Sequence, residues 1–139
     1  MSGALDRAAP GSPLDFSGVI ASLSPHFFCV VSRDRVVRAM QEGRDRLARG
    51  WARCTAARGR SGESCDADSL RACRWSSTGA MWTPSADDNA VNNALEILTL
   101  CARSLGFASL HGFDGRAATT QADVLALYDR AIAALEAQR

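Results

Sequence analysis

Apolar residues recur every three to four positions in four long stretches of this chain, and polar residues fill the positions between them. This spacing places the apolar side chains of each stretch on one face of a helix. The stretches cover residues 32–49, 68–83, 85–105 and 120–135. The pattern therefore predicts four main helices.

The predicted helix ends carry residues that commonly begin or stop helices. Ser32 and Asp68 precede their periodic stretches, where a side-chain oxygen can accept a hydrogen bond from the first turn. Glycine and proline follow the last periodic residues, as expected where a helix stops. The other boundary residues are the capping-box pairs Ser85–Asp88 and Thr120–Asp123 and the terminators Gly50, Pro84 and Gly106. Thr119 is the alternative cap of the last helix.

The N-terminal region has weaker patterns. Residues 1–13 are rich in Ala, Gly, Ser and Pro and lack apolar spacing, which predicts a flexible tail. Residues 14–23 carry one apolar stripe that stops before Pro25, which predicts a short helix. The apolar run at 26–31 is too short to distinguish a strand from a helix, and both remain open.

Two further segments have the composition of loops. Residues 52–67 are rich in Arg, Gly, Ser and Cys and predict an exposed loop, whose functional role stays open. Residues 107–115 are turn-rich and can hold a short extended piece. With 25 alanines and 6% aromatic residues, the composition favours helices over sheets. We predict an all-α fold, in which residues 14–139 form a single-domain bundle of four main helices plus a short N-terminal helix.

Arginine supplies every basic side chain except the two histidines. The chain has 16 Arg and no Lys, which excludes a P-loop lysine and Schiff-base chemistry. Residues 33–74 hold 11 Arg against 6 acids, whereas residues 75–139 hold 4 Arg against 7 acids. This asymmetry predicts contact between a basic and an acidic face, within one chain or across a dimer.

The sequence also predicts where in the cell the protein is found. The start of the chain lacks the pattern of a signal peptide, and the longest strongly apolar run, 27–31, is far shorter than a membrane span. The cysteines are odd in number and irregularly spaced, so we expect free thiols in a cytoplasmic protein. They are Cys29, Cys54, Cys65, Cys73 and Cys101.

Several landmarks between residues 33 and 132 resemble a family of small uncharacterised bacterial and phage proteins. They are Gly50-Trp51, the block 68–75, Gly79-Ala80 and the block 120–132. In that family a Trp-Asn-Asp stretch precedes the final helix, whereas this chain has Gly112-Phe113-Asp114. The family has no assigned function, so the resemblance implies none for this chain.

The sequence contains only weak patterns for a metal site or a catalytic nucleophile. No Cys-x-x-Cys pair exists, so we predict no metal site, although Cys54, Cys65, Cys73 and His111 could converge in space. Ser109 lies near His111 and Asp114, but the Gly-x-Ser-x-Gly nucleophile pattern is missing. Residues at this spacing in a turn more often form capping hydrogen bonds than a catalytic dyad. We therefore expect neither catalysis nor a cofactor.

Nucleic-acid binding is one alternative function, because arginines are dense in the predicted helix 32–49. Acidic residues are interleaved with them and can pair with them on the helix surface. Trp51, Trp75 and Trp82 could stack on bases, but tryptophan at helical spacing more often lies in a core. The candidate phosphate-binding residues are Arg33, Arg35, Arg38, Arg44 and Arg46.

The other alternative is a small enzyme or ligand-binding protein that uses the 107–115 loop. Its candidate ligand-binding residues are Arg74, Trp75, His111 and Asp114. Our main hypothesis is a non-enzymatic binding or protein-interaction module that forms a homodimer. Close packing of the small residues in helix 68–83, the three tryptophans and the opposite charges of the two halves are the basis for predicting self-association.

Overall fold

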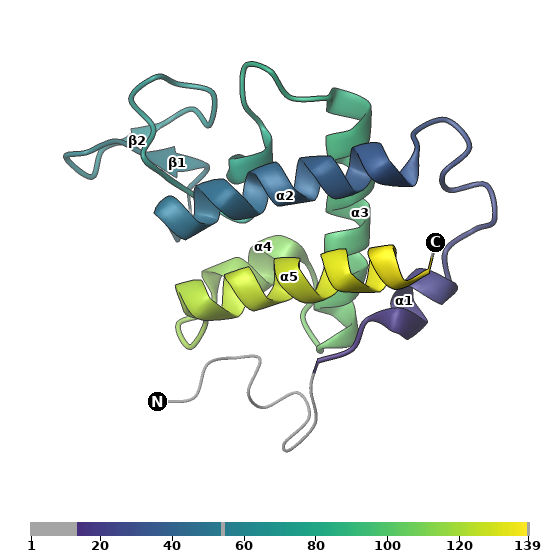
Figure 1. Cartoon of the computed structure of the whole chain (residues 1–139). Coiled ribbons are helices and arrows are strands. Elements are labelled where there is room, and N and C mark those ends of the chain that lie inside the picture. Colours follow the sequence, from purple (N-terminus) through teal and green to yellow (C-terminus); the bar gives the residue numbers. More distant parts are fainter. Residues whose placement is uncertain (1–13, 54, 139) are drawn as a thin grey trace.

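Two long helices, α2 (Arg33–Arg49) and α5 (Gln121–Ala137), lie side by side and run in opposite directions (Figure 1). They belong to a computed structural model that describes residues 14–53 and 55–138. The predicted tail 1–13 lies outside the described residues. The apolar stripe of each helix faces the interior, with Val36, Met40 and Leu47 buried on α2. The pair forms one layer of the molecule.

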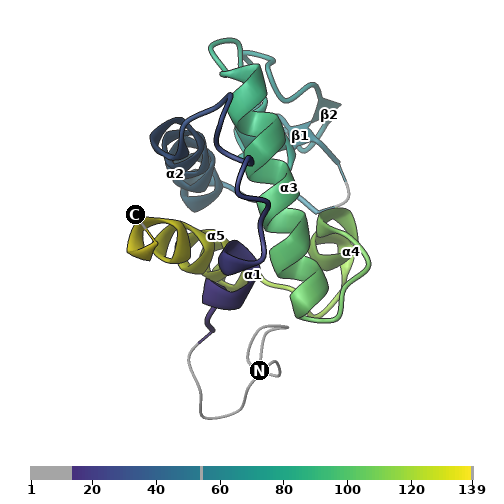
Figure 2. The same ribbon diagram turned by 90° about the vertical axis from the view of Figure 1, so that its right-hand side faces the viewer.

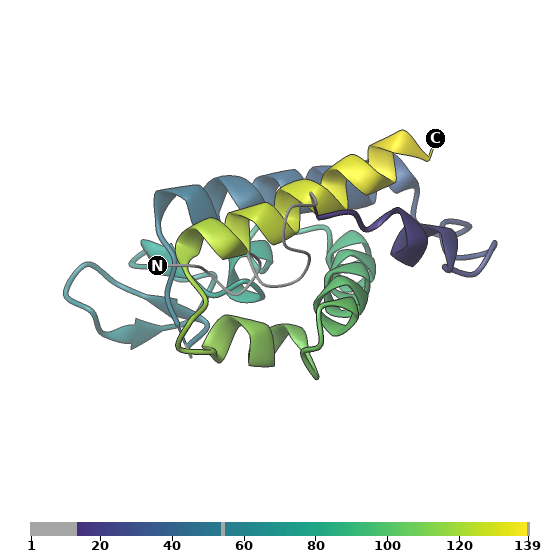
Figure 3. The same ribbon diagram turned by 90° about the horizontal axis from the view of Figure 1, so that it is seen from below.

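The second layer crosses the first. Helix α3 (Asp88–Ser104) runs across α2 and α5, and α4 (Leu110–Gly115) follows it along the same face (Figures 2 and 3). The short helix α1 (Ser17–Ala21) packs against α3 and α5. The predicted helices at 32–49, 85–105 and 120–135 and the short N-terminal helix are thus confirmed, with boundaries shifted by a few residues.

A small sheet lies at one end of the helical layers, so the all-α prediction is wrong. The strands are β1 (Ala57–Arg58), β2 (Ser64–Cys65) and β3 (Arg74–Trp75). They form an antiparallel sheet in the order β2-β1-β3, in which Ala57 pairs with both Cys65 and Trp75. The protein therefore has a mixed α/β fold that is 52% helical. The predicted loop 52–67 contains the first two strands.

The predicted helix 68–83 does not exist. Its backbone instead pairs with distant residues, because Trp75 N donates to Gly50 O and Ser76 N donates to Ala56 O, both at 3.1 Å. A single turn of 3-10 helix, η2 (Gly79–Met81), completes the segment. The run Ser76-Ser-Thr-Gly is poor in strong helix formers, so long-range pairing prevails over the local apolar spacing. Leu70, expected on the buried stripe, is fully exposed.

Two ambiguous segments also differ from expectation. Residues 26–31 form turns and bends, neither strand nor helix. The 107–115 segment contains α4 where a short extended piece was considered, and Ser109 Oγ accepts a hydrogen bond from Gly112 N at its start. Six residues are too few to show helical periodicity in a sequence.

The caps explain where the long helices begin. Ser32 accepts from Arg35 N, and Thr120 forms the predicted capping box with Asp123. Helix α3 differs, because Asp87 and not Ser85 accepts from Ala90 N. Gly106 follows α3 with φ of 96°, a conformation that favours glycine. Gly50 is the C-cap of α2, as predicted.

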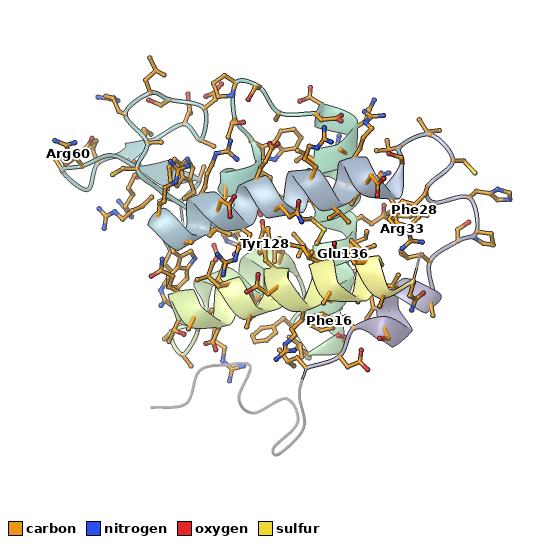
Figure 4. All side chains as sticks on the ribbon, viewed as in Figure 1. Phe16, Phe28, Arg33, Arg60, Tyr128 and Glu136 are labelled. Carbon is orange, nitrogen blue, oxygen red and sulfur yellow. The ribbon has the colours of Figure 1, made fainter. Side chains whose placement is uncertain are left out.

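The core lies between the two layers. Tyr128 sits at its centre between α2 and α5 (Figure 4), and its hydroxyl donates to the backbone oxygen of Ser77. Burial, with a contribution from nearby Asp114, raises the pKa of Tyr128 well above its ordinary value. The largest fully buried side chains are Tyr128, Phe113, Met40, Leu47, Ile97, Leu98, Leu127 and Leu135.

The Tyr128→Phe variant tests the link between the helical core and the segment before η2. The phenyl ring fits the same space, but Ser77 O loses a buried partner. We expect the free energy of unfolding to fall by about 1–2 kcal/mol, as for other buried hydrogen bonds. Urea denaturation monitored by circular dichroism measures it. Stability equal to that of the wild type would show that this bond contributes nothing.

Candidate functional site

A pocket of about 380 Å³ opens where α4, the η2 turn and the sheet region meet. We call it the Trp82 pocket. Its walls come from segments that are far apart in sequence, which the pairing of β1 with β3 brings together. The lining residues are Thr55, Ala56, Ala67, Ser76, Thr78, Gly79, Trp82, His111 and Asp114.

Asp114 is the buried charged residue of this pocket. Its side chain lies on α4 and is 3% exposed. Asp114 Oδ1 accepts from Trp51 Nε1 and from Ser77 Oγ, each at 2.7 Å. Asp114 Oδ2 has a longer contact, 3.4 Å, with Ser77 N. The carboxylate is therefore fixed in position by groups from the loop after α2 and the segment before η2.

His111 and Trp82 form other parts of the wall. His111 precedes Asp114 by three residues on α4, so the two side chains lie on neighbouring positions of one helix face. His111 is exposed to solvent. Trp82 is the C-cap residue of η2 and is partly buried. An aromatic wall and a fixed carboxylate are features of small-molecule sites.

The structure brings together two of the four predicted ligand-binding residues. His111 and Asp114 line the Trp82 pocket, whereas Arg74 and Trp75 do not. Trp75 is 8% exposed, and its Nε1 donates to Ala67 O at 3.2 Å. It is a core residue, as the helical spacing had suggested, although it lies on a strand.

Sequence reasoning treated Trp51 and Trp82 as core residues and missed their places at this site. Trp51 holds Asp114, and Trp82 lines the pocket. Ser77 was missed as well. No local pattern marks these residues, because their roles depend on the η2 turn and on strand pairing. Asp114 was identified because it lies close in sequence to Ser109 and His111 within the 107–115 segment.

The geometry gives no support to the nucleophile alternative. Ser109 caps α4, which is the capping role that its spacing suggested. Ser76 Oγ accepts from Gly79 N at 2.9 Å. The thiol of Cys29 lies 3.7 Å from His26 Nδ1, but both residues are on an exposed turn outside the Trp82 pocket. In the described ranges 14–53 and 55–138, no group of three His, Cys, Asp or Glu residues could hold a metal ion.

The candidate nucleic-acid residues serve largely as links within the fold. Arg35 forms a two-bond pair with Asp87 at 2.8 and 2.7 Å, and Arg44 forms one with Asp129 at 2.9 and 3.3 Å. The hydrogen bonds from Arg35 lower the pKa of Asp87 below its ordinary value. Both pairs join the basic segment to the acidic one within a single chain.

Two further arginines of that set donate to backbone oxygens. Arg33 contacts Leu135 O at 3.1 Å and lies over the Phe28 ring (Figure 4). Arg46 contacts Ala80 O at 3.1 Å, and partial burial lowers its pKa. Arg38 is exposed beside a second pocket of about 210 Å³ that also contains two acids. Phosphate binding would therefore compete with existing contacts of four of the five arginines.

The cysteines of the described residues differ in exposure. Cys29, Cys65, Cys73 and Cys101 are free thiols; Cys54 lies outside the described residues. Burial raises the pKa of Cys101 to about 12. Because the thiolate is the reactive form, Cys101 is protected by both its burial and its pKa.

Alkylation with iodoacetamide at about pH 8, close to the ordinary pKa of a thiol, tests this difference. We expect the exposed Cys29 and Cys73 to react in the native protein, and Cys101 to react only after denaturant is added. Peptide mass spectrometry reports each site. Equal rates for Cys101 and Cys29 under native conditions would show that α3 is not packed as described.

The fold and the pocket thus define a mixed α/β domain with one candidate small-molecule site. A scan against protein-family models, a search of curated proteins and a search of solved structures each found no match. The resemblance to small bacterial and phage proteins therefore stays a prediction. None of the described helices combines the length and apolar character needed to cross a membrane.

Proposed function

We propose that this protein binds a small organic molecule in the Trp82 pocket. The pocket volume of about 380 Å³ lies in the range of ligand sites, roughly 300–1,000 Å³. It lies at the junction of the sheet region and α4, where side chains from several segments converge.

The buried Asp114 carboxylate carries this proposal. Its position is fixed by two short hydrogen bonds from Trp51 and Ser77, so it is organised before any ligand arrives. Preorganised polar groups reduce the entropy lost on binding. Trp82 offers an apolar surface beside it. One polar anchor next to an aromatic wall suits the recognition of a small molecule.

A binding role fits these residues better than a catalytic role. Two serine hydroxyls at the site are already engaged, because Ser77 Oγ donates to Asp114 Oδ1 and Ser76 Oγ accepts from Gly79 N. Neither hydroxyl is paired with an imidazole. We propose a cytoplasmic location as well, and the free thiols of the described cysteines support it.

Self-association stays a prediction. One of its three bases, the small-residue helix 68–83, does not exist. The charged halves meet within one chain through the Arg35–Asp87 and Arg44–Asp129 pairs. Sedimentation velocity of the purified protein would measure the oligomeric state directly.

Fragment screening by ¹H–¹⁵N correlation spectra tests the binding proposal. We expect hits to shift the Trp82 indole signal and the backbone signals of 76–79 and 111–114. Trp82→Leu should weaken these hits. His111→Gln should perturb them, and His26→Gln, an exposed histidine on a distant turn, is the matched control. A screen without hits at these signals, or with hits equally strong in Trp82→Leu, would refute the proposal.

A further inference from the structure

We infer that the ligand of the Trp82 pocket is a small organic cation, an amine that is protonated at neutral pH and carries an apolar body. The inference rests on the proposed function and adds the chemical class of the ligand. It follows from the charge balance around Asp114, the unused hydrogen-bonding capacity of its carboxylate, and the surroundings of Trp82.

Asp114 has no cationic partner in the part of the chain that the structure describes. Its donors are an indole N–H, a hydroxyl and a backbone N–H, all of them neutral. The Arg35–Asp87 and Arg44–Asp129 salt bridges do not include it. Buried carboxylates are normally paired with a cation, because burial of an isolated charge is costly. A ligand cation would supply the missing charge.

The carboxylate also has acceptor capacity left. An ionised carboxylate offers about four lone-pair sites. From the residues that the structure describes, Oδ1 accepts two short bonds, whereas Oδ2 has only the 3.4 Å contact with Ser77 N. Because Asp114 lines the pocket, a donor placed there can complete its hydrogen bonding. An ammonium group is such a donor, and its bond to a carboxylate is charge-assisted.

Trp82 provides the second recognition element. Arginine side chains lie over two other indoles, Arg53 over Trp51 at 4.8 Å and Arg49 over Trp75 at 5.6 Å. Within the described residues no arginine lies over Trp82. A tryptophan face attracts cations, so the unoccupied Trp82 ring suits an ammonium group and the methylenes beside it.

The charged side chains next to the pocket are negative, as is the Asp114 carboxylate, and would attract a cation. Trp82 also borders an open hollow of about 530 Å³, which carries the exposed acids Asp66, Asp68 and Asp88. None of the arginines between residues 14 and 138 lines this hollow or the Trp82 pocket. A field of one sign near a pocket raises the local concentration of the opposite ion. Anionic ligands are disfavoured for the same reason.

The experiment compares ligands that share one apolar body and differ in charge. The probes are 2-phenylethylamine, 2-phenylethanol and 3-phenylpropanoate, together with a panel of similar amine, alcohol and carboxylate triplets. Binding is measured by isothermal titration and by the spectra described above. We expect the amines to bind at least about tenfold more tightly than their alcohols, as for a charge-assisted bond. The carboxylates should not bind.

Two variants and one control show which group of the pocket recognises the charge and which recognises the apolar body. Asp114→Asn keeps an oxygen that can accept from Trp51 and Ser77 but removes the charge, so the preference for amines should disappear. Asp45→Asn removes an exposed carboxylate that lines neither pocket and should leave it unchanged. Trp82→Leu keeps the charge and should weaken every amine. If Asp114→Asn does not fold, the ligand triplets and the Trp82→Leu variant still test whether the pocket prefers cations.

The outcomes are distinct. Alcohols or carboxylates that bind at the same signals as tightly as amines would overturn the cation inference and leave the binding proposal intact. A panel in which no member perturbs the pocket would overturn both. Amine binding that Asp114→Asn does not weaken would show that another group recognises the charge, and would overturn the assignment to Asp114.

Discussion

Replacement of Trp75 by alanine is expected to lower the free energy of unfolding by about 3–5 kcal/mol, the usual cost of removing a large aromatic side chain from a core. The indole is 8% exposed and belongs to the main hydrophobic core. Its Nε1 bond to Ala67 O would be lost too. Urea denaturation followed by circular dichroism measures the loss.

The Trp82→Ala variant is the control for Trp75→Ala. Trp82 is partly exposed and lines a pocket, so its removal leaves less buried space unfilled. We expect a clearly smaller loss of stability from it. A denaturation midpoint that is unchanged in Trp75→Ala, or a larger effect of Trp82→Ala, would contradict the placement of β3 against the core.

Replacement of Gly79 by alanine is expected to cost about 3 kcal/mol, at the upper end of the range for overpacking. An added Cβ would lie 2.0 Å from Ala56 O and 2.9 Å from Ala56 C. These are backbone atoms, held by the bond from Ser76 N to Ala56 O, so they cannot move aside as a side chain can. Thermal unfolding measures the effect.

Gly18→Ala is the matched control for Gly79→Ala. It is a helical glycine in α1, and a Cβ there would meet nothing within 4 Å. Alanine is the better helix former, so this variant should be neutral or slightly stabilising. If Gly79→Ala melted at the wild-type temperature, the close approach of η2 to residue 56 would be wrong.

The elements that could be predicted from the sequence have local signals. Helices α2, α3 and α5 each have 17 residues, long enough to show a regular apolar stripe. The cap residues Ser32 and Thr120 act within three positions of themselves, so the sequence shows them directly. Such agreement between pattern and capping makes a helix predictable from sequence alone.

The sheet could not be predicted in this way. Its strands have two residues each, and Trp75 pairs with Ala57 across a long stretch of chain. The spacing of apolar residues within the 68–83 segment fits a helix as well as it fits a strand. The segment is not helical because its backbone bonds to the distant residues Gly50 and Ala56. A prediction based on local spacing has no access to those contacts.

Only the part of the candidate site that depends on local spacing could be predicted from the sequence. His111 and Asp114 share one short helix, so their proximity follows from their spacing. Trp82 joins them only because η2 turns the chain back toward α4. Arg74 and Trp75 were expected near them on a helix. They lie on strand β3 instead and do not line the pocket.

The exclusive use of arginine affects the behaviour of this fold at high pH. Arg35 and Arg44 each hold an acidic side chain of another segment, and a lysine in those places would lose its proton near pH 10.4. A guanidinium keeps its charge to about pH 12 and beyond. The Asp87 and Asp129 partners raise the pKa of Arg35 and Arg44 further. These links therefore persist through alkaline solutions in which lysine-based ones would fail.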